Sequence, residues 1–381
     1  MHKINGIETI GIVGGGQLAR MMITAIKKLG LKVAVLDPHA DSPCHSLADH
    51  HITANYDDAD GYKKLADVSD LITYDFEHID VDLLSTLEAH GHRVLPSVKN
   101  LRIIQDKLTQ KQALQKAGIP VADFSIMKTL KDIKKYPFML KSRRGGYDGK
   151  GNYLVKEETD LIPAMQTLQG DLMAESVVDF DKEVSVIAAR SQAGEMVIYP
   201  IAENVHKNNI LDITVVPANL SQELADKSIE TAKRVMECFK GVGTFCVELF
   251  INEKTNTVLV NEVAPRVHNS GHYTIEACRT SQFENHIRAI LGLGLGSTEM
   301  LVPYAGMKNF IGGVREKGIA VYTGIENVHK IPNASVHIYG KVRVTPGRKM
   351  GHVTVTGTTL EEVQQKLEQI NIKVVHLADD D

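Results

Sequence analysis

The chain has 381 residues, of which 43% are hydrophobic and 24% are charged, as in ordinary globular proteins of two or three domains. Its net charge of −4 and its pI near 6.5 argue against general nucleic-acid binding. No apolar run approaches the length of a membrane-spanning helix, and the four cysteines show no C-x-x-C pairing. We therefore expect a cytoplasmic protein with reduced cysteines that binds neither nucleic acid nor membrane.

Residues 1–98 alternate strand and helix patterns and are predicted to form a Rossmann-like α/β domain. Gly14, Gly16 and Ala19 match G-x-G-x-x-A between a strand and a helix, and Asp37 follows about twenty residues on. This pattern alone suggests dinucleotide binding. A glycine turn before a helix also suits any anion, or simply tight packing, so these interpretations stay open. The later elements of this domain are predicted at 71–74, 80–89 and 93–95.

Residues 99–296 are predicted to form two α+β subdomains, with helices that stop at glycine or proline and strands that pair across polar turns. The predicted helices are 100–117, with a break at Gln105-Asp106, 221–239 and 281–291. The predicted strands are 137–140, 171–177, and two hairpins formed by 183–190 with 195–200 and by 244–251 with 257–261.

Residues 297–381 are predicted to form a small strand-rich domain, which begins after a glycine-rich stretch that reaches Gly296. Strands are expected at 335–339, 341–344 and 352–356. The chain is expected to end in a helix that starts with the capping box Thr358-x-x-Glu361.

The segment from Lys141 to Asn152 reads K-S-R-R-G-G-Y-D-G-K-G-N, with four glycines among four cations. Glycines permit positive φ and turn N–H groups inward, and cations supply countercharge, so the loop suits a polyphosphate. It is not a Walker A loop, because G-x-x-x-x-G-K-[ST] does not occur. The apolar run before it predicts a strand that delivers Lys141 to the mouth of the loop. The alternative interpretation is a basic, solvated hairpin turn.

Glu248 and Glu262 lie on the two strands of one predicted hairpin, within otherwise apolar runs. An unpaired buried carboxylate is costly, so each of these glutamates requires a cation. Together with the amide oxygen of Asn261 they are hard oxygen ligands, which suit Mg²⁺ that also binds phosphates. Either glutamate alone could be half of a buried salt bridge, but two of them beside a polyphosphate loop favour a metal site.

Four segments of the chain read K-S-R-R-G-G-Y-D-G-K-G, E-S-V-V at 175–178, V-E-L-F, and N-E-V-A-P-R-V-H-N-S-G-H at 261–272. Together they resemble the ATP-grasp enzymes and, more closely, the N5-carboxyaminoimidazole ribonucleotide synthase family of purine biosynthesis. The resemblance extends from G-G-G-Q-L-A-R-M at 14–21 to G-R-K-M-G-H at 347–352. It implies an ATP-grasp fold with an N-terminal Rossmann-like domain, a lid near 122–180 and a small strand-rich C-terminal domain, and it suggests a homodimer.

The resemblance implies that ATP lies between the two α+β subdomains. Lys107 and Lys141 would contact the phosphates, Glu183 the ribose, and Glu248 with Glu262 would hold Mg²⁺. Family members often carry arginine at the place of Lys107, and lysine keeps the charge without the bidentate fork. The implied nucleotide-binding residues are Lys107, Lys141, Gly146, Tyr147, Asp148, Gly149, Lys150, Gly151, Asn152, Glu175, Ser176, Val177, Val178, Glu183, His206, Asn261 and Glu262.

The same resemblance implies that bicarbonate attacks ATP to give ADP and carboxyphosphate, which then carboxylates 5-aminoimidazole ribonucleotide. Three cations from two distant segments would suit the ribose phosphate and a carboxylated intermediate. The implied catalytic residues are Lys141, Tyr147, Asp148, Arg266 and His268. The implied acceptor-binding residues are Tyr147, Asp148, Arg266, His268, Asn269, Ser270, Lys341 and Arg348.

Three other functions compete with this one. The first is another ATP-grasp ligase or transformylase with a different acceptor, against which the segments at 269–272 and 348–352 argue. The second is an NAD-dependent oxidoreductase built on Gly14, Gly16 and Asp37, which leaves the basic loop and both glutamates unexplained. The third is a non-catalytic nucleotide-binding regulator, which the full set of phosphate, metal and acceptor residues disfavours.

Overall fold

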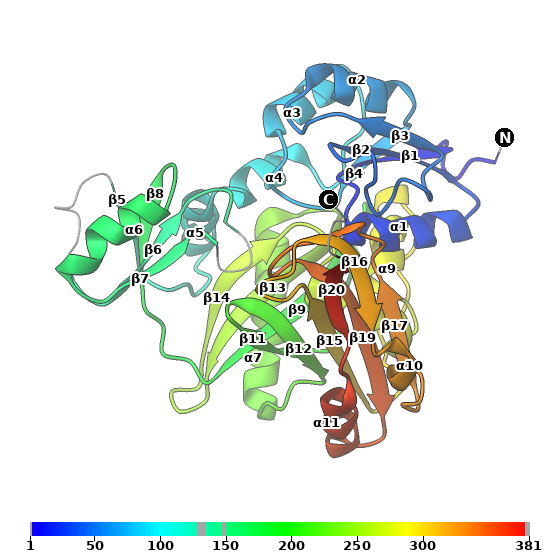
Figure 1. Ribbon diagram of the computed structural model, residues 1–381. Coiled ribbons are helices and arrows are strands. Elements are labelled where there is room, and N and C mark those ends of the chain that lie inside the picture. Colours follow the sequence, from blue (N-terminus) through cyan, green and yellow to red (C-terminus); the bar gives the residue numbers. More distant parts are fainter. Residues whose placement is uncertain (1, 128–134, 147–149, 378–381) are drawn as a thin grey trace.

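The computed structural model of the chain describes residues 2–127, 135–146 and 150–377 (Figure 1). These residues form four sheets: a parallel sheet at the N-terminus, a small antiparallel sheet, a nine-stranded antiparallel sheet, and a three-stranded sheet near the C-terminus. The predicted combination of α/β and α+β architecture is confirmed. No helix in these ranges is long and apolar enough to cross a membrane.

The N-terminal sheet has the strand order β3-β2-β1-β4, and every neighbouring pair is parallel. All residues of β1 are buried, as expected for a strand in a parallel sheet covered on both faces. The predicted strand at 93–95 is reduced to one parallel bridge between Ile72 and Val94. The elements are β1 (Thr9–Val13), α1 (Gln17–Lys28), β2 (Lys32–Asp37), β3 (His50–Thr53), α2 (Ala59–Asp67), β4 (Leu71–Tyr74) and α3 (Val81–Ala89).

The small antiparallel sheet has the order β5-β8-β6-β7 and projects to the left in Figure 1. Two helices precede it, and the predicted break between them at Gln105-Asp106 is confirmed. Asp106 begins the second helix, because its side chain accepts hydrogen bonds from the N–H groups of Leu108 and Thr109. The elements are α4 (Val98–Ile104), α5 (Lys107–Lys116), β5 (Phe124–Met127), β6 (Phe138–Ser142), β7 (Asn152–Val155), η2 (Glu158–Asp160), α6 (Leu161–Thr167) and β8 (Leu172–Ser176).

The nine-stranded sheet has the order β14-β13-β9-β11-β12-β15-β19-β17, with β10 paired to β9. Both predicted hairpins are confirmed, as β9 with β10 and as β13 with β14. Helix α7 packs Leu224, Ala232 and Val235 into the core of this sheet. The elements are β9 (Lys182–Arg190), β10 (Met196–Ile198), β11 (Ala202–Lys207), β12 (Ile210–Val216), α7 (Gln222–Phe239), β13 (Gly243–Asn252), β14 (Thr257–Ala264), η3 (Asn269–Gly271), α8 (Thr274–Ala277), α9 (Gln282–Leu291), β15 (Tyr304–Ile311), β17 (Ala334–Ile338) and β19 (Lys349–Gly357).

Strand β15 pairs with β12, so the nine-stranded sheet continues across residue 296. The predicted strands of this part are confirmed as β17, β18 and β19, whereas the sequence analysis missed β15, β16 and β20. The predicted terminal helix is α11, and it is not the last element because β20 follows it. The domain boundaries at 98 and 296 stay predictions. The remaining elements are β16 (Gly318–Thr323), α10 (Ile325–Val328), β18 (Arg343–Val344), α11 (Leu360–Gln369) and β20 (Lys373–Leu377).

The cap of α11 lies one residue later than predicted. Oγ1 of Thr359, rather than of Thr358, accepts a hydrogen bond from the Glu362 N–H at 3.2 Å. The Glu362 carboxylate in turn accepts from the Thr358 N–H at 2.8 Å. The sequence T-T-L-E-E contains two overlapping threonine–glutamate pairs, and spacing alone does not choose between them.

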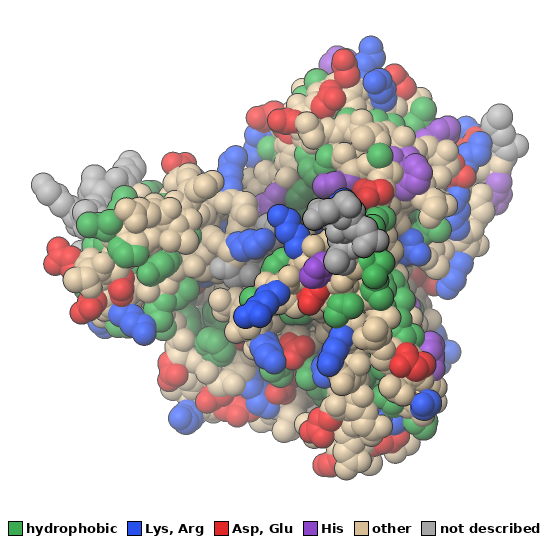
Figure 2. All heavy atoms as spheres, in the orientation of Figure 1, with side chains coloured by type: hydrophobic (Ala, Val, Ile, Leu, Met, Phe, Trp, Pro, Cys, Tyr) green, Lys and Arg blue, Asp and Glu red, His purple; other side chains and the backbone are tan. Residues whose placement is uncertain are grey.

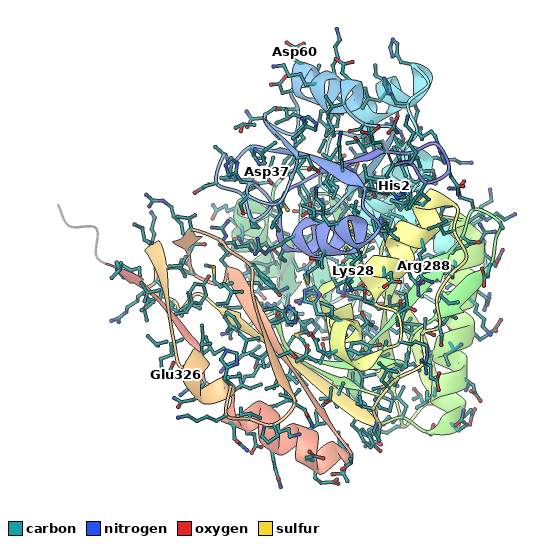
Figure 3. The ribbon with its side chains drawn as sticks, turned by 90° about the vertical axis from the view of Figure 1, so that its right-hand side faces the viewer. His2, Lys28, Asp37, Asp60, Arg288 and Glu326 are labelled. Atoms are coloured by element: carbon teal, nitrogen blue, oxygen red, sulfur yellow. The ribbon has the colours of Figure 1, made fainter. Side chains whose placement is uncertain are left out.

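Lys and Arg side chains gather over the middle of the face shown in Figure 2, below the N-terminal sheet and beside the small sheet. The N-terminal sheet is held there by α1, which packs against α9 in a shared hydrophobic core. Figure 3 shows the two helices side by side, with Lys28 marking α1 and Arg288 marking α9. This contact brings the segment after β4 next to the segment after β14.

The glycine turn that follows β1 is occupied by carboxylates of the protein itself. The Gly15 N–H donates to Asp37 Oδ2 and the Gly16 N–H donates to Asp75 Oδ2, each at 2.8 Å. Gly14 has a φ of +98°, and a Cβ there would lie 1.8 Å from Asp75 Oδ1. Burial raises the pKa of Asp75 to about 7, and the nearby Asp37 charge adds to this. Two N–H groups of the turn are therefore taken by carboxylates of the protein, which favours the tight-packing interpretation over anion binding.

We predict that calorimetric titration with NAD or NADP detects no binding to this protein. A pyrophosphate placed at the turn would meet the carboxylates of Asp37 and Asp75, which already take its N–H groups. A micromolar dissociation constant for NAD that disappears in Asp37→Ala, but persists in the exposed control Asp41→Ala, would contradict this interpretation.

Candidate active site

Helix α5 joins the small sheet to the nine-stranded sheet through two lysines. Lys107 and Lys111 are four residues apart and lie on the same face of the helix. Lys107 Nζ lies 2.7 Å from Glu262 Oε2 on β14. Lys111 Nζ lies 2.7 Å from Glu175 Oε2 on β8 and donates to the Asn261 carbonyl oxygen at 3.2 Å. The helix thus contacts both sheets through charged groups.

Glu175 is a buried carboxylate shared by two lysines. Its other oxygen, Oε1, lies 2.7 Å from Nζ of Lys141 on β6, and all three side chains are buried. Burial alone would raise the pKa of Glu175, but the charges of Lys141 and Lys111 outweigh it and lower that pKa. Burial lowers the pKa of Lys111, although Glu175 acts in the opposite direction. An internal anion therefore holds Lys141 in place at the mouth of the loop.

The predicted strand before the glycine-rich loop is confirmed as β6, and its Lys141 is paired with Asn152 of β7. Gly151 has a φ of +84°, and a Cβ at Gly146 would lie 2.6 Å from the Lys150 carbonyl oxygen. The two ends of the loop approach each other this closely only because both positions are glycine. Lys141 is 8% exposed, so the alternative of a fully solvated basic turn does not describe its side chain.

The base of this loop is tied to α5 by Arg143. Its Nη2 lies 2.5 Å from Asp106 Oδ2, and its Nε donates to Asp106 Oδ1 at 3.1 Å. Arg144 Nε lies 3.6 Å from the same carboxylate. An internal carboxylate therefore pairs with Arg143, and the expectation that the loop cations supply countercharge to a polyphosphate stays a prediction. The predicted loop residues Tyr147, Asp148 and Gly149 lie outside the described residues.

The predicted metal ligands Glu248 and Glu262 are directly opposite each other on β13 and β14. Burial raises the pKa of Glu248 to about 7, and the charge of Glu262 adds to this. Glu262 is paired with Lys107, whereas Oε1 of Glu248 lies 3.3 Å from Nε2 of His268. A divalent cation between the two carboxylates would offset their repulsion, so the pair fits Mg²⁺.

The predicted nucleotide-binding residues at 175–178, 183 and 206 lie at or next to the ends of β8, β9 and β11. His206 Nδ1 lies 3.0 Å from Glu183 Oε2. Burial would lower the pKa of His206, but the hydrogen bond to Glu183 and the charges of Glu183 and Glu248 together outweigh burial and raise that pKa. Ser176 ends β8, the Val177 side chain is 45% exposed and Val178 is half-buried. An exposed valine next to the Glu175 cluster is an apolar surface that suits a purine ring.

The predicted acceptor residue Arg266 is anchored from the N-terminal sheet. Its guanidinium makes two contacts with the Glu77 carboxylate, from Nε to Oε2 and, at 3.0 Å, from Nη2 to Oε1. Burial alone would raise the pKa of Glu77, but Arg266 outweighs it and lowers that pKa to about 2. Burial and the Arg266 charge lower the pKa of His268 well below its usual value, so its imidazole is neutral near pH 7.

Two further acceptor residues are buried and paired within the protein. The Asn269 and Asn309 side-chain amides bond each other reciprocally, at 3.1 and 2.9 Å. Ser270 is 0% exposed, and its Oγ lies 2.7 Å from Ser185 Oγ and 2.9 Å from His268 Nδ1. In this structure Ser270 therefore supports His268 and does not face an acceptor with its own side chain.

The two acceptor cations from the C-terminal part lie in the segments on either side of β18, and Arg348 directly precedes β19. Lys341 Nζ donates to the Lys349 carbonyl oxygen at 2.7 Å and lies 5.7 Å from the centre of the Tyr339 ring. Arg348 Nη1 donates to the Arg343 carbonyl oxygen at 2.7 Å.

Three domain families match successive parts of the chain. The ribonucleotide synthetase preATP-grasp domain matches residues 7–105, the ATP-grasp domain matches 112–283, and the phosphoribosylaminoimidazole carboxylase C-terminal domain matches 305–366. The chain is also 45% identical, over 91% of its own length and 90% of the relative, to the N5-carboxyaminoimidazole ribonucleotide synthase of Bacillus subtilis strain 168. It belongs to the N5-carboxyaminoimidazole ribonucleotide synthase family.

Solved structures of this synthase family have the same fold. The N5-carboxyaminoimidazole ribonucleotide synthetase from Thermotoga maritima is 41% identical with a TM-score of 0.87, covering 97% of this chain and 100% of that one. The synthase from Aspergillus clavatus, solved with ADP and 5-aminoimidazole ribonucleotide, is 34% identical with a TM-score of 0.85, covering 95% and 99%. The predicted family and ATP-grasp fold are confirmed.

Beyond the synthase-family motifs, the site contains residues that sequence analysis missed. Lys111 pairs with Glu175, Glu77 pairs with Arg266, and Cys246 lies beside His268. The four-residue spacing of Lys111 from Lys107 was a signal that could have found it. The roles predicted for the individual site residues remain predictions.

We predict that the Glu77–Arg266 pair gives an acid-dependent part of stability. The pKa of Glu77 falls from its usual 4.5 to about 2 on folding. Such a carboxylate stabilises the fold above pH 4.5 and loses that contribution as pH falls toward 2. This difference is worth about 3 kcal/mol, of which roughly 2 kcal/mol is lost between pH 6 and pH 3.

The measurement is the free energy of unfolding in urea for wild type and Glu77→Gln at several pH values between 6 and 3. The two proteins should converge as pH falls. The control is Glu299→Gln, which removes a surface pair with Arg279 and should change stability by less than about 1 kcal/mol. A difference between wild type and Glu77→Gln that does not vary with pH would contradict the assignment.

Proposed function

We propose that this protein carboxylates 5-aminoimidazole ribonucleotide, with ATP and bicarbonate, to N5-carboxyaminoimidazole ribonucleotide in purine biosynthesis. The observation that carries the proposal is the contact between the two halves of the site. Glu248, of the carboxylate pair, lies 3.3 Å from His268, of the predicted acceptor wall. Carboxyphosphate formed at the carboxylate pair would therefore lie beside the acceptor.

We propose that Lys107 and Lys141 release their internal carboxylate partners and bind phosphates of ATP instead. Lys107 and Lys141 each have one carboxylate partner, Glu262 and Glu175 respectively. ATP phosphates offer stronger anionic partners for these ammonium groups. Glu175 stays neutralised when Lys141 turns to a phosphate, because Lys111 remains bound to it.

We propose Glu248 and Glu262 as the ligands of Mg²⁺, in agreement with the repulsion that raises the pKa of Glu248. When bound, Mg²⁺ neutralises the charge that builds up on the phosphates as bicarbonate attacks. We propose that the glycine-rich loop excludes water, which would destroy carboxyphosphate without product. Tyr147 and Asp148 are proposed to close over both substrates from this loop.

The acceptor is proposed to bind between Arg266, Lys341 and Arg348. Arg266 is oriented by Glu77, so its guanidinium is fixed before the acceptor arrives. Carboxylation of the exocyclic amine releases a proton, and His268 is the neutral base at this wall. Ser270 contributes by holding the His268 ring in position. We further propose that the protein works as a homodimer in the cytoplasm, as its family resemblance suggests.

The function is tested by measuring phosphate release from ATP and Mg²⁺ with and without bicarbonate and 5-aminoimidazole ribonucleotide. We expect fast release only with both, together with a product that mass spectrometry identifies as the carboxylated ribonucleotide. Phosphate release that ignores the ribonucleotide, or a product formed from another acceptor, would contradict the proposal and favour a different ATP-grasp ligase.

We predict that Glu248→Gln and Glu262→Gln each lower turnover while leaving the fold intact. Loss of one charge that stabilises a phosphoryl-transfer transition state costs about 2–4 kcal/mol, or about 30- to 1000-fold in rate. The matched control is Glu253→Gln in the turn of the same hairpin, where the carboxylate is exposed. Folded variants that keep near-normal turnover at saturating Mg²⁺ would show that these glutamates are not the metal ligands.

A further inference from the structure

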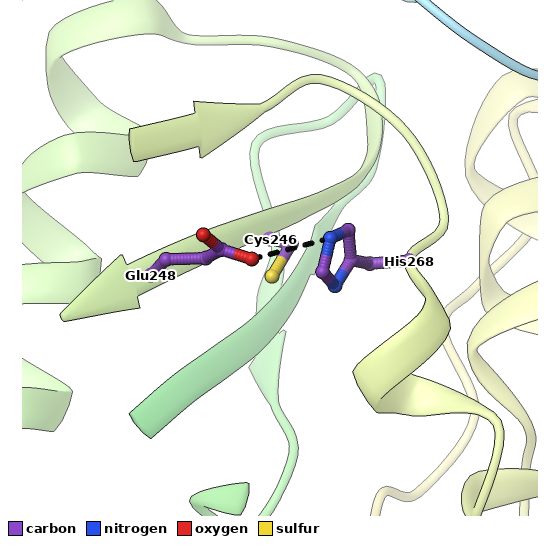
Figure 4. A group of neighbouring side chains, drawn as sticks. All are labelled: Cys246, Glu248 and His268. Carbon is purple, nitrogen blue, oxygen red and sulfur yellow. Dashed lines mark ion pairs between the residues drawn. The ribbon is translucent and has the colours of Figure 1, made fainter. Parts of the chain in front are cut away.

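Cys246, Glu248 and His268 converge at the end of the β13–β14 hairpin, and the proposed reaction gives no role to the cysteine (Figure 4). Cys246 and Glu248 are two residues apart on β13, so their side chains leave the strand on the same face. His268 approaches from the segment that follows β14. One ligand atom from each of the three residues lies within 4.8 Å of the other two.

We propose that these three residues form a binding site for a thiophilic divalent cation such as Zn²⁺. Sulfur, imidazole nitrogen and carboxylate oxygen are the donors that zinc takes in proteins, whereas Mg²⁺ prefers oxygen alone. Ligand atoms about 2.0–2.3 Å from a tetrahedral zinc ion lie about 3.3–3.8 Å from one another. Glu248 Oε1 and His268 Nε2 are 3.3 Å apart, and all three ligand atoms lie within 4.8 Å of one another. Side-chain movements of about 1 Å therefore bring the three atoms onto one ion.

The surroundings of the site supply hydrogen bonds that such a metal requires. Ser270 Oγ lies 2.9 Å from His268 Nδ1 and 3.9 Å from Cys246 Sγ. When Nε2 of His268 binds a metal, its Nδ1–H donates to Ser270 Oγ, and the Ser270 hydroxyl donates to the thiolate. Ser185 Oγ donates to the second lone pair of Ser270 Oγ at 2.7 Å. One buried hydroxyl thus orients two of the three ligands.

This arrangement requires the tautomer of His268 that is protonated at Nδ1, and it breaks the weak hydrogen bond from the Ser270 N–H to that nitrogen. The Ser270 N–H now lies 3.3 Å from His268 Nδ1, which accepts that bond only when it carries no proton. Metal binding requires the ring proton on Nδ1 rather than on Nε2, and it displaces the thiol proton of Cys246 and any proton on Glu248 to solvent. Nothing is oxidised or reduced.

The ion would share Glu248 with the proposed Mg²⁺ pair and occupy His268 on the acceptor side. A bound thiophilic cation therefore excludes the productive metal and inhibits the carboxylation, a consequence that rests on the proposed function. The metal site itself does not rest on the proposed function, because it is defined by the side chains of Cys246, Glu248 and His268 and by Ser270, which Cys246 and His268 share.

The experiment titrates the full-length protein, without ATP or ribonucleotide, with Co²⁺ as a spectroscopic probe for the zinc site. We expect a near-ultraviolet thiolate-to-cobalt absorption band that saturates at one ion per chain and disappears on addition of Zn²⁺. Cys246→Ser and Cys246→Ala should both lack the band, with circular dichroism establishing that they are folded. The matched control is Cys238→Ser, at a half-buried cysteine on α7, which should retain it. No band in wild type, or a band that persists in both Cys246 variants, would overturn the proposal.

Two further measurements test the role of Ser270 and the inhibition by Zn²⁺ separately. Ser270→Ala should weaken Co²⁺ binding by about 10- to 100-fold, because an outer partner of two ligands is lost. An unchanged affinity would overturn the assigned role of Ser270. Zn²⁺ should inhibit turnover reversibly, and each Cys246 variant should need at least about 10-fold more Zn²⁺ for half inhibition of its own rate. If the protein is not a carboxylase, the cobalt band still appears, so failure of the two proposals is distinguishable.

Discussion

The site depends on one carboxylate buried between two lysines. Glu175 is 3% exposed and bridges Lys111 on α5 and Lys141 on β6, while α5 reaches β14 through Lys107 and Glu262. Removal of one partner from such a buried cluster leaves an uncompensated charge, at a cost of about 3–5 kcal/mol. The small sheet, with the base of the glycine-rich loop, and the β13–β14 hairpin are therefore positioned relative to one another by charge rather than by apolar packing alone.

The same charges prepare the site for anionic substrates. Lys107, Lys141 and Arg266 each already face an internal carboxylate. They are therefore charged and oriented within a partly buried site. Arg266 keeps its partner Glu77 through a bidentate pair that joins the N-terminal sheet to the acceptor wall. In the glycine turn of that N-terminal sheet, by contrast, carboxylates of the protein accept hydrogen bonds from two of the N–H groups.

The β13–β14 hairpin carries both carboxylates that are proposed to bind Mg²⁺. Glu248 and Glu262 face each other across the strand pair, and Glu248 also contacts His268. This carboxylate thus lies where hard oxygen ligands and the softer donors Cys246 and His268 meet. Which cation occupies the hairpin would then depend on ligand type, because oxygen ligands suit Mg²⁺ and a thiolate suits zinc.

The sequence by itself determined the family, the fold class, the two hairpins, the break before α5 and the strand that carries Lys141. These follow from local patterns, since helical periodicity, caps, polar turns and motif spacing are all contained within short segments. Only the tertiary structure decided that β15 joins β12, that Asp75 fills the glycine turn, and that Arg266 pairs with Glu77 across 189 positions of the chain. The partner of a charged side chain is chosen by how distant segments pack, and no local pattern of residues records that choice.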